Sequence, residues 1–158
     1  MGQIQEAPHQ GTKTMYGRNI TMLAPYSRFD FSKLRPKKGF EAHGISKRTA
    51  PILLRGLPVQ IIPNYYFTFP GSEKTEVGVL WLVAQQAGFR KEELVIFVEL
   101  AHRYLAARFG RRYLVNPRYC IVLDVVSGVD FRFSDLLVGK AEPQVDKTLN
   151  ELNALLRK

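Results

Sequence analysis

The segment from Phe89 to Asp135 carries the most continuous hydrophobic pattern of the chain and decides its fold class. It reads FRKEELVIFVELAHRYLAARFG over residues 89–110 and RRYLVNPRYCIVLDVVSGVDFRFSD over residues 111–135. In the first part apolar residues recur every three or four positions, which predicts a helix over residues 91–109. In the second part apolar runs flank Ser127-Gly128, which predicts a two-residue β-hairpin turn. A helix followed by a hairpin favours an α+β fold.

The expected hairpin turn also fixes an expected register between its two strands. Because side chains alternate between the two faces of a sheet, three pairs share one face. These pairs are Val126 with Val129, Asp124 with Phe131, and Val122 with Phe133. Asp124 and Asp130 then lie on opposite faces of the sheet.

Other elements follow on both sides of this segment. Residues 51–69 contain short apolar runs separated by Gly and Pro, which predicts two or three short strands. A helix is predicted over residues 72–87, where apolar residues recur at spacings of three and four. Ser72 is a good N-cap for this helix, and Gly88 resembles its stop. A further helix is expected over residues 143–156, where leucines form an apolar stripe.

Together these elements predict an α+β fold. It has a small mixed or antiparallel sheet with a helix pair and a C-terminal helix, preceded by an extended basic N-terminal arm. The expected domain organisation is a basic arm with little regular structure over residues 1–50 and a single α+β domain over residues 51–158. In the first half of the helix over 91–109, Val95, Ile96 and Leu100 make the helix apolar nearly all round. Such a helix is covered by other elements or by another subunit.

The charge distribution is asymmetric. The formal net charge is +9 over 158 residues. Residues 1–70 hold ten Lys or Arg against three acids, whereas residues 71–158 hold thirteen against eleven. This asymmetry predicts a polyanionic partner, with nucleic acid, either DNA or RNA, as the first expectation. An acidic protein surface or an anionic lipid is the second expectation from charge. A protein partner or a homo-oligomer is also plausible, and no membrane association is expected.

The basic arm is the main candidate site. Lys and Arg can neutralise phosphates, and the interleaved aromatic residues can stack on unpaired bases. The predicted nucleic-acid-binding residues are Arg28, Lys33, Arg35, Lys37, Lys38, Lys47, Arg48, Arg111 and Arg112. A solvated or self-docked arm, whose charge only aids solubility, is the competing interpretation.

A helix-turn-helix over residues 80–99 is a second candidate. Ala84, Gly88, Phe89, Leu94 and Phe97 match its spacing. However, apolar side chains stand where a DNA-reading helix should be polar. An ordinary packed helix pair explains the same pattern.

Catalytic candidates are few. Glu99 and His102 lie three apart on one helix, and Asp124 projects from an apolar sheet face, where an unpaired carboxylate would be costly. A divalent metal held by Asp124, Asp130 and Glu99 would suit phosphodiester hydrolysis, although the expected register places Asp124 and Asp130 on opposite faces. Structural partners explain the same residues, namely Arg103 for Glu99 and Arg118 or Arg112 for Asp124. We predict no metal site and no cofactor.

The sequence also indicates the cellular compartment in which the protein is expected. No apolar stretch is long enough to span a bilayer, and the first residues lack the apolar centre of a secretory signal. A single cysteine, Cys120, excludes a disulfide framework. We therefore expect a cytoplasmic, non-enzymatic nucleic-acid-binding protein. A structural or adaptor subunit of a multiprotein assembly is the second hypothesis, and a metal-dependent nuclease is the third.

Overall fold

The computed structural model describes residues 9–37, 39–85 and 87–157. The chain divides into two compact units, Met1–Phe31 and Ser32–Lys158. The first unit contains α2 (Gln10–Leu23) and the 3₁₀-helix η1 (Ala24–Arg28). The ring of Tyr26 in η1 packs with the rings of Phe29 and Phe31, which follow it. Residues 1–50 thus include the helix α2, and the expected domain boundary at residue 50 stays a prediction.

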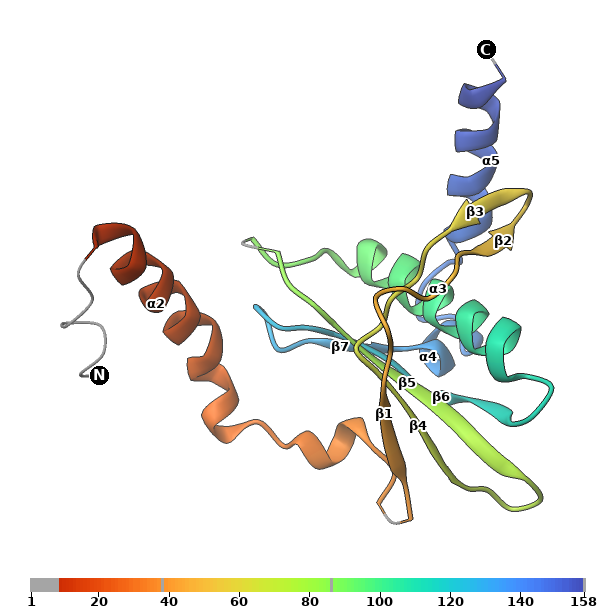
Figure 1. Ribbon diagram of the computed structural model, residues 1–158, viewed down its shortest axis with the longest axis horizontal. Coiled ribbons are helices and arrows are strands. Elements are labelled where there is room, and N and C mark those ends of the chain that lie inside the picture. Colours follow the sequence, from red (N-terminus) through yellow and green to blue (C-terminus); the bar gives the residue numbers. More distant parts are fainter. Residues whose placement is uncertain (1–8, 38, 86, 158) are drawn as a thin grey trace. The chain divides into compact units, whose positions relative to one another are not determined.

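The second unit is built on a five-stranded mixed sheet (Figure 1). Its strands, in spatial order, are β1 (Glu41–Gly44), β4 (Tyr65–Pro70), β5 (Thr75–Val83), β6 (Leu114–Asp124) and β7 (Asp130–Arg132). Only β5 and β6 are parallel, because α3 (Lys91–Phe109) connects them as a crossover. The α+β class with a mixed sheet is confirmed, and α3 has the bounds that the sequence predicted.

Smaller elements surround this sheet. The 3₁₀-helix η2 (Phe31–Leu34) precedes β1, and β2 (Ile52–Leu54) and β3 (Leu57–Val59) form a separate hairpin. After β7 come α4 (Phe133–Leu137) and the C-terminal helix α5 (Val145–Leu156), which confirms the predicted C-terminal helix. Among the described residues, no helix combines the length and apolar character needed to cross a membrane.

The helix predicted over residues 72–87 is wrong, because β5 occupies this segment. Val77, Gly78 and Val79 are all buried, so consecutive residues on both faces of β5 are covered. A central strand that is apolar on both faces loses the alternation that distinguishes a strand from a helix. Its apolar residues then fell by chance at helical spacings.

The hairpin prediction is correct in location but wrong in register. Val122 pairs with Phe131 rather than with Phe133, and the residues between the strands are 125–129. The reason is the side chain of Asp124, which accepts hydrogen bonds from Val126 N at 3.0 Å and from Ser127 Oγ at 2.7 Å. An aspartate that bonds its own following backbone favours a wider turn. Because the shift is two residues, every side chain keeps its predicted face.

The hydrophobic core lies between α3 and one face of the sheet. Leu105 and Ala101 of α3 pack with Val77, Val79 and Cys120 near one end. Near the other end, Leu94, Val95 and Val98 pack with Val83, Val122, Phe131 and Leu136 of α4. The all-round apolar surface of α3 is therefore covered largely by elements of its own chain.

Candidate nucleic-acid interface

The predicted basic residues fall into separate groups. Arg28 ends η1 in the first unit, and Lys38 lies outside the described residues. Lys33, Arg35 and Lys37, here named the pre-β1 cations, lie in the segment that leads into β1. Lys47, Arg48, Arg111 and Arg112, here named the α3-end cations, lie after β1 and after the last turn of α3.

The pre-β1 cations alternate with buried residues. Leu34 and Pro36 are buried, whereas the three cations beside them are exposed. The segment is also held by Arg132, whose Nη2 donates a hydrogen bond to the Lys33 carbonyl at 2.8 Å. Because the apolar residues anchor the segment on the domain, the charged side chains extend into solvent.

A hydrogen bond joins the two chain segments that carry the α3-end cations. The guanidinium of Arg108 donates a hydrogen bond to the carbonyl of Ala50, which joins the segment after β1 to the last turn of α3. The negative end of the helix dipole favours cations at this position. Arg112 also lies over the ring of Tyr113, at 5.2 Å from the ring centroid.

A row of stacked rings adjoins the α3-end cations. His43 stacks on Tyr66 with ring centroids 4.7 Å apart, and Tyr66 stacks on Phe109 with centroids 4.6 Å apart. These residues come from β1, β4 and the end of α3. Sequence reasoning missed this row, because residues so far apart in the chain give no local pattern.

Some basic residues of the described chain take part in ion pairs, and others do not. Among the residues that the structure describes, carboxylates pair with Arg55, Arg90, Arg103, Arg132 and Lys140. None of the described pre-β1 or α3-end cations takes part in these ion pairs. Their charge is therefore not offset locally, and it is available to a polyanion.

The surroundings of Asp124 give it a structural role. It is fully buried at the end of β6, and its Oδ2 accepts a hydrogen bond from Phe89 N at 3.0 Å. Burial would raise the pKa of Asp124, but hydrogen bonds from Ser127 and from backbone N–H groups hold that pKa below its ordinary value. Donors of this kind, rather than the expected Arg112 or Arg118, satisfy the carboxylate. Asp124 thus ties the start of α3 to the hairpin turn.

The packing of Asp124 against the turn before α3 also explains why a glycine stands at position 88. Gly88 has φ +73°, a left-handed conformation, and a Cβ at this position would lie 3.1 Å from Asp124 Oδ2. The glycine that resembled a helix stop is therefore required by a turn that packs against a buried carboxylate.

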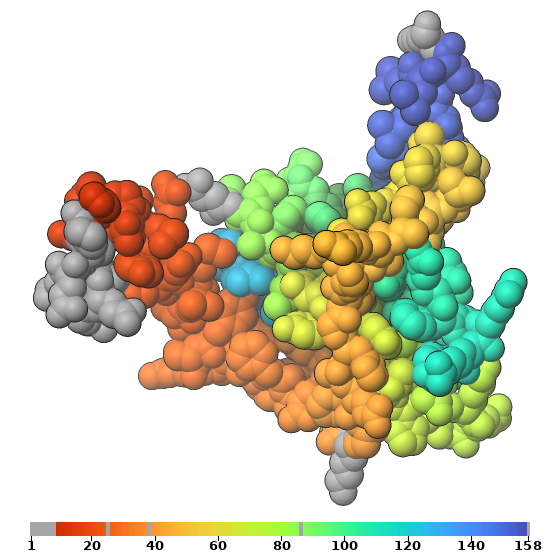
Figure 2. All heavy atoms as spheres, viewed as in Figure 1, coloured from red at the N-terminus to blue at the C-terminus, as the bar shows by residue number. Residues whose placement is uncertain are grey.

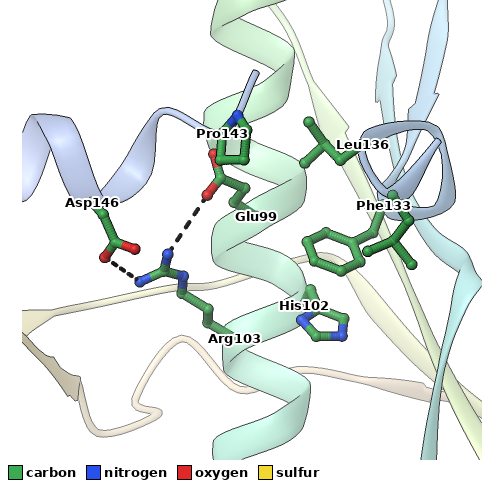
Figure 3. Close-up of a pocket in the computed structure, with 8 residues that line it drawn as sticks. Glu99, His102, Arg103, Phe133, Leu136, Pro143 and Asp146 are labelled. Carbon is green, nitrogen blue, oxygen red and sulfur yellow. Dashed lines mark hydrogen bonds and ion pairs between the residues drawn. The ribbon is translucent and has the colours of Figure 1, made fainter. Parts of the chain in front are cut away.

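Glu99 anchors the start of α5. It is 3% exposed, and its Oε1 accepts hydrogen bonds from Gln144 N at 2.5 Å and Val145 N at 3.1 Å. These are N–H groups at the start of α5 that no side chain of their own helix caps. The expected ion pair with Arg103 is present, with 3.6 Å between Arg103 Nη2 and Glu99 Oε2 (Figure 3).

The ion pair extends into a network. Arg103 Nη1 lies 2.9 Å from Asp146 Oδ1, and the same oxygen lies 2.9 Å from Nε of Arg55 in the β2–β3 hairpin. The two arginines hold the pKa of Asp146 far below its ordinary value. Glu99, Arg103, Asp146 and Arg55, here named the α5-start network, join α3, α5 and the hairpin.

His102 borders a cavity of about 280 Å³ beside this network, between α3, α4 and the start of α5. Its ring stacks on Phe133 with centroids 3.8 Å apart, as Figure 3 shows. Burial and, to a smaller extent, the charge of Arg103 lower the pKa of His102. The half-buried imidazole of His102 packs on the phenyl ring of Phe133, which gives it a packing role.

The three catalytic candidates do not form one centre. Asp124 bonds to the turn at the start of α3, whereas Glu99 and His102 face the start of α5 and α4. Within residues 9–37, 39–85 and 87–157 there is no group of three or more His, Cys, Asp or Glu that could hold a metal ion. Asp124 and Asp130 lie on opposite faces of the sheet, since Asp130 pairs with Leu123.

The helix-turn-helix is also wrong. Its first helix would need residues 80–87, but β5 runs to Val83 and ends just before Ala84. Leu94 is buried and Phe97 half-buried in the core beneath α3. The segment therefore has no pair of helices to present to a DNA groove.

Comparison with known proteins gives no relative: no family model, no curated protein and no solved structure matches this chain. Its function therefore has to be inferred from the arrangement of its own residues.

Proposed function

We propose that this protein is a non-enzymatic nucleic-acid-binding protein that uses its basic, aromatic-bearing N-terminal segment to contact the phosphate backbone. The observation that carries the proposal is the grouping of exposed cations outside the ion pairs, with three of them within residues 33–37 and two pairs at residues 47–48 and 111–112. The pre-β1 and α3-end cations are exposed and take no part in the ion pairs of the described residues. Releasing counterions from a nucleic acid is the main source of affinity for such a surface.

The acidic residues support a binding role over a catalytic one. Glu99 and Asp124 are buried and hydrogen-bonded to backbone N–H groups. Carboxylates committed to such bonds hold the fold together. A cytoplasmic location is part of the proposal, and the buried, unpaired thiol of Cys120 supports it, because reducing compartments keep thiols in this form.

The test is binding of the full chain to a fluorescein-labelled 20-nucleotide oligomer, single-stranded or duplex, measured by fluorescence anisotropy. We expect binding at 50 mM salt that weakens steeply as salt is raised. The triple variant Lys33→Glu, Arg35→Glu, Lys37→Glu should bind about 100-fold more weakly, because three phosphate contacts become repulsive.

A matched control separates this local effect from net charge. Lys74→Glu, Lys147→Glu and Arg157→Glu change the net charge equally at exposed positions elsewhere. This control should bind within about threefold of the unmodified chain. Absence of binding to both oligomers at 50 mM salt would overturn the proposal.

A specific observation favours a second candidate function, that of an adaptor subunit. Leu152, Leu155 and Leu156 on α5 are 45%, 65% and 73% exposed, and Leu53 on the neighbouring hairpin is 75% exposed. Figure 2 shows the last turns of α5 and the hairpin standing out from the rest of the second unit. An apolar surface of this kind favours contact with a protein. A clean monomer by light scattering at high concentration would exclude self-association through this surface.

A further inference from the structure

We propose that the surface at the end of α3 binds the unpaired bases of single-stranded nucleic acid by extending the aromatic stack that ends at His43. This inference rests on the proposed function and assigns its substrate class. It concerns one face of the second unit, which includes His43, Tyr66, Phe109 and the α3-end cations.

The register of the sheet builds the stack. His43 of the edge strand β1 pairs directly with Tyr66 of β4, so the two side chains lie on the same face. Their rings are nearly parallel, at 23°, and the rings of Tyr66 and Phe109 are inclined by 30°. Tyr66 and Phe109 also pack on the core cluster beneath α3, so the core holds two of the three rings in place.

The stack ends at the edge of the sheet. In the order of the strands, β1 has β4 on one side and no strand on the other. Among the described residues, Tyr66 is the ring that stacks on His43, and the His43 side chain is 39% exposed. A base could therefore stack on the imidazole and continue a row that the protein has already ordered, so the rings lose little conformational entropy on binding.

Cations follow, in the sequence, two of the elements that supply the stack. Lys47 and Arg48 follow β1, and Arg111 and Arg112 follow α3, whereas Glu41 precedes His43 with its carboxylate 3.9 Å from the imidazole Nε2. Glu41 repels a phosphate, so the backbone of a bound strand is drawn toward the cations. Basic groups beside stacked rings are the combination that binds single strands without reading their sequence.

The arrangement disfavours a duplex. In a duplex each base is already stacked between its neighbours, so only a terminal base pair could reach the imidazole. A single strand can turn any base outward. The stack therefore distinguishes the two forms of nucleic acid, although the cations alone do not.

The experiment compares His43→Ala with Tyr65→Ala in the full chain. Tyr65 precedes Tyr66 on β4, points to the opposite face and is 48% exposed, so it is a matched aromatic control. The probes are a labelled 20-nucleotide oligothymidine and a mixed-sequence duplex of equal length, measured by anisotropy. Urea unfolding confirms that both variants remain folded.

We expect His43→Ala to weaken oligothymidine binding about 5- to 100-fold and to leave duplex binding unchanged. Tyr65→Ala should change neither. A strand carrying 5-bromodeoxyuridine should photo-cross-link to the tryptic peptide of residues 39–47, which contains His43. A merely structural role for His43 would not produce this cross-link.

The outcomes separate the two proposals. Equal affinity for single strand and duplex, with no effect of His43→Ala, overturns the stacking inference and leaves the proposed function standing if salt still weakens binding. No binding of either probe overturns both. Loss of affinity for both probes in His43→Ala also overturns the inference, since it would show a general rather than a base-specific contact.

Discussion

The middle of α3 and its C-terminal end use charged residues in opposite ways. Toward the α5-start network, Arg103 is shared between two carboxylates, and Glu99 is buried against backbone N–H groups. At the C-terminal end, only five residues later in the helix, Arg108 bonds to a backbone carbonyl, and the neighbouring α3-end cations are exposed. The comparison teaches that positive charge is not evenly available to a partner: carboxylates neutralise it in the middle of α3, whereas it stays exposed at the C-terminal end.

The two regions also differ in what their residues stabilise. The α5-start network joins three elements that are distant in sequence, and Arg55 takes part from the hairpin turn with φ +49°. A positive φ is unfavourable for a residue with a side chain, and it persists where surrounding contacts hold it. The α3-end cations hold no such strained position, so we expect changes there to alter binding rather than folding.

The largest effect should follow removal of the buried carboxylate. Glu99→Ala leaves two N–H groups of α5 without their acceptor and takes one partner from Arg103, so we expect about 3 kcal/mol less free energy of unfolding. Urea denaturation followed by circular dichroism measures this difference. Glu92→Ala, an exposed acid in the first turn of the same helix, is the control and should change stability by less than about 0.5 kcal/mol. A loss below about 1 kcal/mol for Glu99→Ala would show that the network is not structural.

Removal of the α3-end cations should weaken binding and leave stability nearly unchanged. Replacing Lys47, Arg48, Arg111 and Arg112 together with Ala should leave the free energy of unfolding within about 1 kcal/mol, because none of them is buried or ion-paired among the described residues. The slope of log Kobs against log salt for a single strand should become shallower by about 3, since each lost phosphate contact contributes about 0.7. An unchanged slope would mean that this end of α3 does not touch the nucleic acid.

A smaller effect should appear in the pH dependence of stability. Burial lowers the pKa of His102 from its ordinary value of 6.5. As the pH falls below about 6.5, the unfolded chain takes up a proton at this residue more readily than the folded chain does. The free energy of unfolding should therefore decrease from pH 7 to pH 5, by less than about 1 kcal/mol from this residue.

His102→Gln should flatten this part of the curve. Urea unfolding at pH 7, 6 and 5 measures the free energy of unfolding of the unmodified chain and of the variant. Any contribution from the other histidines is common to the two proteins and cancels in the comparison. Parallel curves would show that His102 titrates alike in the folded and unfolded chain.

The candidate site was only partly visible in the sequence. The basic residues could be named, because charge needs no tertiary context to be recognised. Whether their charge is available to a partner could not be predicted, because that depends on which carboxylates the fold brings near them. Asp146, for example, reaches Arg55 and Arg103 from a distant helix. The partners of Asp124 were hidden for the same reason, since Phe89 N approaches it only after the crossover helix is in place.

The sequence by itself determined α3, the C-terminal helix and the faces of the hairpin, because periodicity, Pro and Gly act locally. It did not determine β5, whose burial on both faces erased the pattern of a strand, nor the register set by the Asp124 side chain. Only the tertiary structure aligned His43, Tyr66 and Phe109 in one stack. The physical reason is that stacking and ion pairing depend on distance in space, and a mixed sheet with a crossover brings together residues that the chain separates.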